Sequence, residues 1–238
     1  DYASLRKYVL EEAYEVADAI QRSDMRELRD ELGDLLFQIV FYSQIAREEG
    51  HFDFQDVAQG ICDKMVRRHP HVFADAEITN EAELRQAWEH NKAEERAAKR
   101  QAAEASQMDG VARALPALIR AEKLQKRAAR VGFDWPDAQG AFDKVREELD
   151  EVEAEAASSD PDRLQAELGD LLFAMVNVIR LLGMDAEQTL SLANEKFERR
   201  FRAMETQLRD AGRQDLQELS LEALDAAWER VKEAEEGT

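Results

Sequence analysis

The chain is poor in cysteine, with Cys62 as its single thiol among 238 residues. One thiol cannot form an internal disulfide, which excludes a disulfide-stabilised secreted fold and predicts a reducing, cytoplasmic location. The apolar runs are short and interrupted by charged residues, so no membrane span and no membrane partner are expected. No signal-peptide pattern is visible either.

Basic residues are also in short supply. Lys and Arg together number 32 against 52 Asp and Glu, and the formal net charge is -20. A field of that sign repels polyanions, which excludes binding of long nucleic acid through the general surface. A small phosphate ligand stays open, because bound metal ions can invert the local charge.

Helix-breaking residues are rare, since only 4 Pro and 10 Gly interrupt a chain rich in Ala, Leu, Glu and Arg. That composition favours helix throughout, and apolar positions recur with the helical period. The sequence therefore predicts an all-α protein. Its helices are expected at roughly 5–20, 25–49, 54–68, 80–106, 116–129, 138–157, 161–182, 185–211 and 216–234, with an irregular segment at 69–78.

The heptapeptide ELGDLLF occurs at residues 31–37 and again at 167–173, 136 residues later. The same offset relates two EExxE segments, and KxxRR and AWExxK segments repeat at offsets of 132 and 140. The repeats predict two tandem, duplicated four-helix domains, at 1–106 and 119–238, joined by a helical linker at 107–118. A GFDW segment at 132–135 precedes only the second acidic helix.

Each half carries five acidic residues on two successive predicted helices. Residues three and four apart share a helix face, so antiparallel neighbours would bring the five carboxylates together. The cluster would repel itself strongly, and a hard cation removes that repulsion, which favours Mg²⁺ with Mn²⁺ as a substitute. The predicted metal ligands are Glu147, Glu148, Glu151, Glu167 and Asp170, with a second metal site at Glu11, Glu12, Glu15, Glu31 and Asp34.

For a single EExxE segment a solvated helix face would be the better explanation, because Glu-rich helices are common. The ELGDLLF segment, however, sets its two acids inside an apolar stretch, so neither acid is expected to lie far from the core. Buried carboxylates without partners are unfavourable. Because both segments occur twice at one spacing, the metal interpretation is favoured.

Lys196 and Arg200 are four residues apart on one helix face, and Arg199 is adjacent. Cations facing an acidic metal site can bind phosphate oxygens, and ordinary salt bridges to the same carboxylates explain the spacing equally well. Trp228 and Trp88 could stack on a base, although a Trp at such a position is more often part of the core.

The combination of EExxE followed by ExxD in both halves, with the KxxRR, GFDW and AWE segments, resembles the MazG family of nucleoside triphosphate pyrophosphohydrolases. The resemblance covers essentially the whole chain, in the two-domain form. It implies an all-α fold, homodimers, and Mg²⁺-dependent hydrolysis of NTPs and dNTPs to the monophosphate and pyrophosphate. It also implies a role in nucleotide-pool housecleaning, with most or all activity in the C-terminal domain.

Carried over residue by residue, the resemblance implies that Glu147, Glu148, Glu151, Glu167 and Asp170 hold Mg²⁺. It implies that Lys196 and Arg200 hold the phosphates, with Arg199 beside them, and that Trp228 lies against the nucleotide. The catalytic candidates are Glu148, Glu151, Lys196 and Arg200. The first-half counterparts are Glu11, Glu12, Glu15, Glu31, Asp34, Lys64 and Arg68, and without a GFDW segment their nucleotide site is expected to be incomplete.

Three other functions are compatible with the sequence. A non-catalytic, acidic helical interaction module would simply solvate its carboxylates. A di-iron carboxylate four-helix protein would normally supply Glu-x-x-His pairs, and neither half has a His at that spacing. A hydrolase of (p)ppGpp or of modified nucleotides would use the same site on another substrate.

Overall fold

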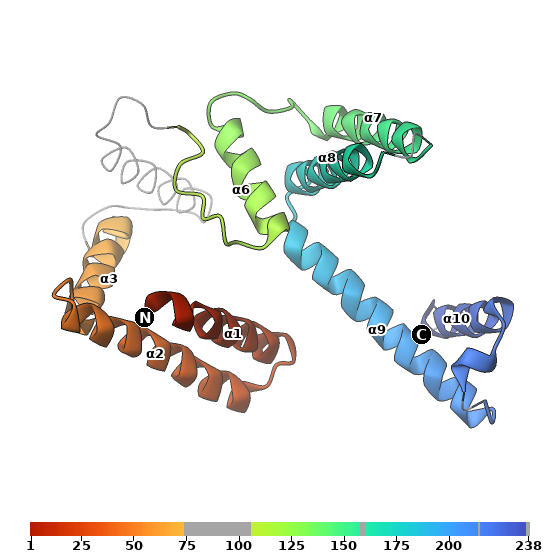
Figure 1. The fold of residues 1–238 in the computed structure, drawn as a ribbon, viewed down its shortest axis with the longest axis horizontal. Helices are drawn as coiled ribbons and strands as arrows, with labels where there is room; N and C mark the ends of the chain where they lie inside the picture. Colours follow the sequence, from red (N-terminus) through yellow and green to blue (C-terminus); the bar gives the residue numbers. More distant parts are fainter. Residues whose placement is uncertain (74–105, 158–159, 214, 237–238) are drawn as a thin grey trace. The chain divides into compact units, whose positions relative to one another are not determined.

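The computed structural model describes residues 1–73, 106–157, 160–213 and 215–236. Every regular element among these residues is a helix, which confirms the all-α prediction (Figure 1). The chain divides into two compact units, Asp1–Ala103 and Glu104–Thr238. No described helix is long and apolar enough to cross a membrane.

Unit 1 is built on a hairpin of α1 (Tyr2–Gln21) and α2 (Met25–Glu48), and α2 also packs against α3 (Phe54–Arg68). The turn between α1 and α2 is short because Asp24 begins α2 at once, its side chain accepting from the backbone of Arg26 and Glu27 at 3.1 Å. Such an N-cap satisfies amides that the first helical turn leaves free.

Unit 2 contains a second such hairpin, formed by α7 (Ala138–Ala156) and α8 (Pro161–Leu181). Asp160 caps α8 and is followed by Pro161, which suits the first helical position. The helix α6 (Ala117–Ala129) packs against α8, and α9 (Ala186–Asp210) packs against α10 (Leu221–Glu236). The linker predicted to be helical at 107–118 is not helical over residues 107–116, which form turns and irregular backbone, and helix begins only at Ala117.

Most predicted helix ends agree with the structure to within a few residues, but two further predictions are wrong. Residues 70–73, expected to be irregular, form the short helix α4 (Pro70–Phe73). Residues 216–234, expected to be one helix, are divided into η1 (Leu216–Glu218) and α10, because Leu219 is extended and Ser220 then begins a new helix. The predicted helix at 80–106 lies, except for its last residue, outside the described residues.

The hairpin of α9 and α10 has its own hydrophobic cluster. Met204 and Leu208 from α9 pack against Ala227 and Val231 from α10, and all four are buried. Trp228 packs against this cluster and is half-buried. The cluster therefore holds the C-terminal helix on α9 by ordinary burial of apolar side chains.

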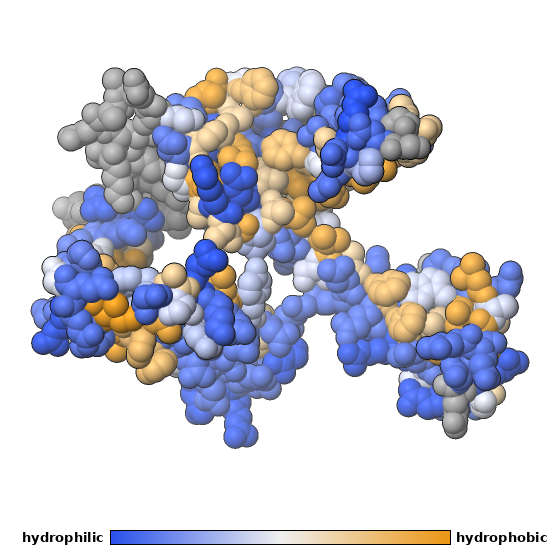
Figure 2. Space-filling model, viewed as in Figure 1, coloured by the Kyte–Doolittle hydropathy of each residue, from blue (hydrophilic) through white to orange (hydrophobic). Residues whose placement is uncertain are grey.

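The α2 and α8 faces that carry ELGDLLF are less covered than the sequence predicts. Leu36 and Leu172 are 52% and 62% exposed, and Figure 2 shows hydrophobic residues at the surface of the described chain. The expectation that both acids lie near the core is wrong for Asp34 and Asp170, which are exposed. Each hairpin thus keeps apolar side chains in contact with solvent, which is typical of an interaction surface.

A charged pair ties the segment before α7 to α8. The guanidinium of Arg180 donates to Asp134 Oδ2 at 3.0 Å and to Asn177 Oδ1 at 3.0 Å. The Arg180 side chain is 9% exposed, so its hydrogen bonds are shielded from water. The hydrogen bond from Arg180 lowers the pKa of Asp134, and partial burial opposes that shift.

Asp134→Asn is expected to lower the free energy of unfolding at pH 7 by about 2 kcal/mol, because a charge-assisted hydrogen bond to a buried guanidinium is lost. A depressed pKa gives stability that is present above 3.8, the ordinary value, and is lost as pH falls through the folded-state pKa. The difference in melting temperature from the wild type should therefore shrink in acid, as followed by circular dichroism. Asp150→Asn, at an exposed position on α7, is the matched control. An Asp134→Asn deficit that stays constant at every pH would contradict the ion pair.

Candidate metal centre

The predicted ligands of the second half lie on the two helices of one hairpin. Glu147, Glu148 and Glu151 belong to α7, and Glu167 and Asp170 belong to α8. The hairpin forms because Asp137 and Asp160 cap the two helices and because buried Ala141 and Ala174 contribute to the apolar faces of α7 and α8. The acidic helices are thus adjacent, as the spacing of the motifs predicts.

Three carboxylates in each half converge. Oxygens of Glu148, Glu151 and Glu167 all lie within 4.8 Å of one another. In unit 1 the group within the same distance is Glu12, Glu31 and Asp34. With the offset of 136, Glu12 corresponds to Glu148 and Glu31 to Glu167, whereas the third member differs between the two halves.

The remaining predicted ligands lie around these groups. Asp170 is exposed on α8, one turn after Glu167. Glu147 binds the side chain of Lys144 at 2.7 Å. In unit 1, Glu11 is exposed on α1, and Glu15 is close enough to Glu12 to share a hydrogen bond with it.

Glu148 is the most deeply placed member of the second cluster. The residue is 4% exposed, and its Oε2 is buried without a hydrogen-bond partner among the described residues. Its Oε1 binds Lys144 at 2.7 Å. A buried carboxylate oxygen without a partner is unfavourable, and a bound cation would satisfy it.

Lys144 is a site residue that the sequence analysis missed. It sits three and four residues before Glu147 and Glu148, which is the spacing of helix ion pairs, so the signal was present in the sequence. Hydrogen bonds to Glu147 and Glu148 raise the pKa of Lys144 above its ordinary value. Lys144 therefore supplies positive charge to a cluster that otherwise repels itself.

The electrostatics of both clusters favour a cation. Although Glu151 is exposed, desolvation by its neighbours raises its pKa, and the negative charges of Glu148 and Glu167 raise it further, against the opposite effect of Lys144. In unit 1, partial burial and the charges of neighbouring carboxylates raise the pKa values of Glu12 and Glu31. Carboxylates that resist ionisation in a shared site have too little positive charge near them.

The corresponding glutamates of the two halves, Glu12 and Glu148, have different partners. In unit 1 the side chain of Gln38, which is 8% exposed, hydrogen-bonds Glu12. Its counterpart at the offset of 136 is Ala174, and the counterpart of Lys144 is Tyr8. Unit 1 thus uses a neutral amide where unit 2 uses an ammonium group.

The predicted phosphate-binding cations lie on α9. Arg199 and Arg200 donate to the two carboxylate oxygens of Glu235 on α10, at 3.1 and 2.7 Å. Lys196 is exposed on α9, and no ion pair joins it or Arg200 to the acidic cluster among the described residues. The two arginines thus form ordinary salt bridges, which was the predicted alternative to phosphate binding. Their partner is Glu235, however, and not the acidic cluster.

The other predicted contacts are placed as follows. Trp228 lies on α10 with its ring 5.3 Å from that of Phe197. Lys64 and Arg68 are half-buried on α3, which packs against α2. Trp88 lies outside the described residues.

Comparison with known proteins fits this arrangement. The MazG nucleotide pyrophosphohydrolase domain matches the chain at residues 1–73 and 139–204. The chain is 52% identical over 236 residues to the nucleoside triphosphate pyrophosphohydrolase of Escherichia coli (strain K12), covering 98% of this chain and 88% of that protein.

Two further relatives show the same likeness. A nucleoside triphosphate pyrophosphohydrolase/pyrophosphatase MazG from Thermotoga maritima is 40% identical over 235 residues, covering 99% of this chain and 88% of that protein. A nucleoside triphosphate pyrophosphohydrolase from Mycolicibacterium smegmatis is 42% identical over 132 residues, covering 55% of this chain and 40% of that protein. With two matched domains and full-length likeness, the chain belongs to the MazG nucleotide pyrophosphohydrolase family.

Proposed function

We propose that the chain hydrolyses nucleoside triphosphates and deoxynucleoside triphosphates to the monophosphate and pyrophosphate, with Mg²⁺ as its cofactor. Family membership and the names of the relatives support the reaction class. The acidic clusters support the metal. A role in housecleaning of the cytoplasmic nucleotide pool follows from that reaction.

The observation that carries the proposal is the environment of Glu148. Its buried Oε2 has no partner among the described residues, and oxygens of Glu151 and Glu167 lie within 4.8 Å. An all-oxygen donor set of this kind fits Mg²⁺, with Mn²⁺ as a substitute. Glu148, Glu151, Glu167 and Asp170 would hold the ion, with Glu147 at the edge of the site.

When bound, Mg²⁺ would offset phosphate charge and make a coordinated water more acidic. A carboxylate of Glu148 or Glu151 orients the attacking water and takes its proton. The water oxygen bonds to the α-phosphorus as the bond to the bridging oxygen of the β-phosphate breaks, and pyrophosphate leaves. Desolvation and neighbouring charges raise the pKa of Glu151, which suits a proton acceptor.

The cations on α9 complete the proposed site. Lys196 and Arg200, with Arg199 beside them, offset the charge that develops on pyrophosphate, and Trp228 lies against the nucleotide. Glu235 binds Arg199 and Arg200 and keeps their guanidinium groups in a fixed place on the α9–α10 hairpin. Phosphate oxygens would compete with Glu235 for these donors.

We also propose that the protein acts as a homodimer. Apolar side chains of the two ELGDLLF segments are exposed in the described chain, including Phe37 at 58% and Leu172 at 62%. Pairing of such faces between two copies would remove them from water.

The reaction is tested by incubating the protein and Mg²⁺ with eight NTPs and dNTPs and separating the products by chromatography. Monophosphate and intact pyrophosphate are expected, because attack falls on the α-phosphorus. Omission of the metal should abolish turnover. Diphosphate and inorganic phosphate would instead show attack at the γ-phosphorus and would refute the proposed reaction.

Glu148→Gln and Asp170→Asn are each expected to lower kcat by about 100-fold or more, because each removes a ligand charge from the metal site. The helical circular dichroism spectrum should stay unchanged. Glu153→Gln, an exposed acid on the same helix as Glu148, serves as the control and should keep its activity. Retained activity in Glu148→Gln or in Asp170→Asn would remove that residue from the site.

Glu12→Gln and Asp34→Asn are expected to change kcat less than twofold, because Glu12 already has the side chain of Gln38 as a partner, whereas Glu148 Oε2 is buried without one among the described residues. Steady-state kinetics under the same conditions measure this. If these two variants are the inactive ones while the second-half variants keep their activity, the assignment of the active domain is reversed.

A further inference from the structure

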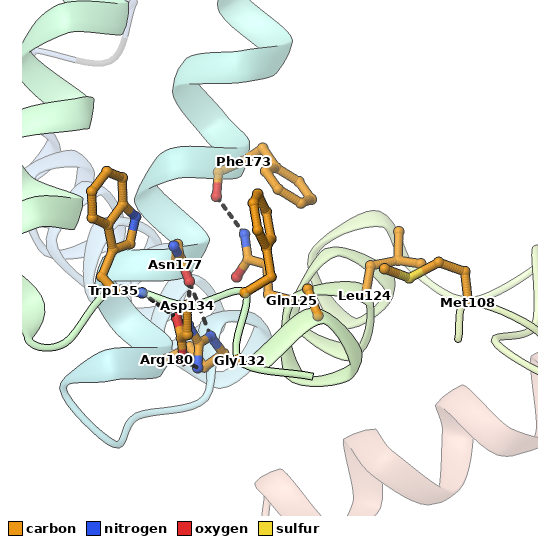
Figure 3. A pocket seen from close by; sticks show the side chains of 11 residues that line it. Met108, Leu124, Gln125, Gly132, Asp134, Trp135, Phe173, Asn177 and Arg180 are labelled. Carbon is orange, nitrogen blue, oxygen red and sulfur yellow. Dashed lines mark hydrogen bonds and ion pairs between the residues drawn. The ribbon is translucent and has the colours of Figure 1, made fainter. Parts of the chain in front are cut away.

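The ion pair between α9 and α10 gives two arginines one carboxylate to share. Glu235 Oε1 accepts from Arg199 Nε at 3.1 Å, and Glu235 Oε2 accepts from Arg200 Nε at 2.7 Å. Elsewhere in unit 2, Arg180 has Asp134 as its carboxylate partner, at 3.0 Å (Figure 3). Within the described part of the α9–α10 hairpin, one positive charge of the shared pair is therefore left for a second anion.

Lys196 adds to the positive charge at this place. It lies one turn before Arg200 on α9, so the two side chains share a helix face. Lys196 is exposed and makes no ion pair among the described residues, and the Arg200 side chain is deeper, at 19% exposed. A phosphate group that bound both cations would come to lie beside the carboxylate of Glu235. Two anions on one guanidinium repel each other, so the phosphate and Glu235 compete for Arg200.

The carboxylate of Glu235 stands where its own helix opposes it. Glu235 lies in the last turn of α10, and the free carbonyl groups of a last helical turn carry partial negative charge. Hydrogen bonds from Arg200 and Arg199 lower the pKa of Glu235, so the carboxylate is ionised at neutral pH. It offers a single charge that the helix end does not help to retain, and a phosphate of higher charge can displace it.

A groove beside the pair gives the displaced carboxylate room. The groove has a volume of about 560 Å³, and its lining includes Arg199, Ala203, Gln207, Val231 and Glu235. Arg199, unlike Arg200, reaches this groove, and its side chain is 63% exposed. Glu235 can therefore release Arg200 and stay bound to Arg199 without any separation of α10 from α9.

Given the proposed nucleotide hydrolysis, we infer that Glu235 competes with the pyrophosphate moiety of the substrate for Arg200 and stays on Arg199 while the phosphates are bound. The inference rests on the proposed hydrolysis, in which Arg200 offsets the charge of the leaving pyrophosphate. After the reaction Glu235 returns to Arg200 and favours the release of pyrophosphate. Glu235 thus determines specificity, because it weakens only ligands that reach Arg200. A nucleoside monophosphate, with its one phosphate at the acidic cluster, is unaffected.

Glu235→Gln removes the charge of this side chain and keeps its shape. The inhibition constant of methylenediphosphonate, a pyrophosphate analogue that cannot be hydrolysed, should fall about fivefold, the upper end of what an exposed ion pair contributes. The inhibition constant of the nucleoside monophosphate should stay unchanged. Glu233→Gln, at an exposed position of the same helix, is the matched control. A rise in the constant for methylenediphosphonate would show that Glu235 holds Arg200 in place for the substrate, and would overturn the competition.

Arg199→Gln tests the second partner of Glu235. With only Arg200 to bind, Glu235 should compete more strongly, so the KM for nucleoside triphosphates should rise about fivefold. In the Glu235→Gln background the same change should alter KM by less than about twofold, because the two residues act through each other. Arg202→Gln, at an exposed position of α9, is the control for the lost positive charge. An equal rise of KM in both backgrounds would overturn the role given to Arg199.

The two proposals fail in different ways. If the wild type hydrolyses the triphosphates and Glu235→Gln leaves the inhibition constant of methylenediphosphonate unchanged, the competition is refuted and the reaction stands. If the wild type hydrolyses none of them, the reaction is refuted, and calorimetric titration with methylenediphosphonate decides on the competition. Tighter binding by Glu235→Gln than by the wild type would support it, and equal or weaker binding would overturn it.

Discussion

Repulsion between like charges is the constraint that the rest of both hairpins has to offset. Carboxylate oxygens of Glu148, Glu151 and Glu167 lie within 4.8 Å of one another, on helices whose adjacency is fixed by their caps and apolar faces. Folding therefore places negative charges together in an environment of reduced dielectric, where their interaction is strong. Desolvation and then the charges of Glu148 and Glu167 raise the pKa of Glu151, and the ammonium group of Lys144 offsets part of the repulsion.

Two other ion pairs of unit 2 differ in their balance of charge. Arg180 is matched by Asp134, whereas Glu235 offers one negative charge to both Arg199 and Arg200. The α9–α10 hairpin therefore keeps an excess of positive charge at this point. In the acidic cluster the imbalance has the opposite sign, because Lys144 offers one positive charge to several carboxylates. The excess negative charge therefore lies on α7 and α8.

Sequence periodicity was enough to predict the hairpins, because caps such as Asp24 and Asp160 and the repeated ELGDLLF are local signals. It could also place Glu148 beside Glu167, since the repeated spacing of the acids predicts that the acidic faces of the two successive helices meet. It could not predict that Arg200 would bind Glu235, 35 residues away, because that pairing depends on how α10 returns along α9. The exposure of Asp170 escaped it too, since the apolar neighbours that should have buried this residue are themselves exposed.

The pairing of Lys144 with Glu148 has a consequence for the folding of the metal-free protein. Where a metal site has no counter-charge of its own, the free energy of metal binding contributes to the free energy of folding. Here the ammonium group of Lys144 offsets part of the carboxylate charge, so the hairpin would not need an ion in order to fold. A divalent ion that bound the cluster would compete with Lys144 for Glu148. In unit 1, where Gln38 offers only a neutral amide to Glu12, such a competition has no equivalent.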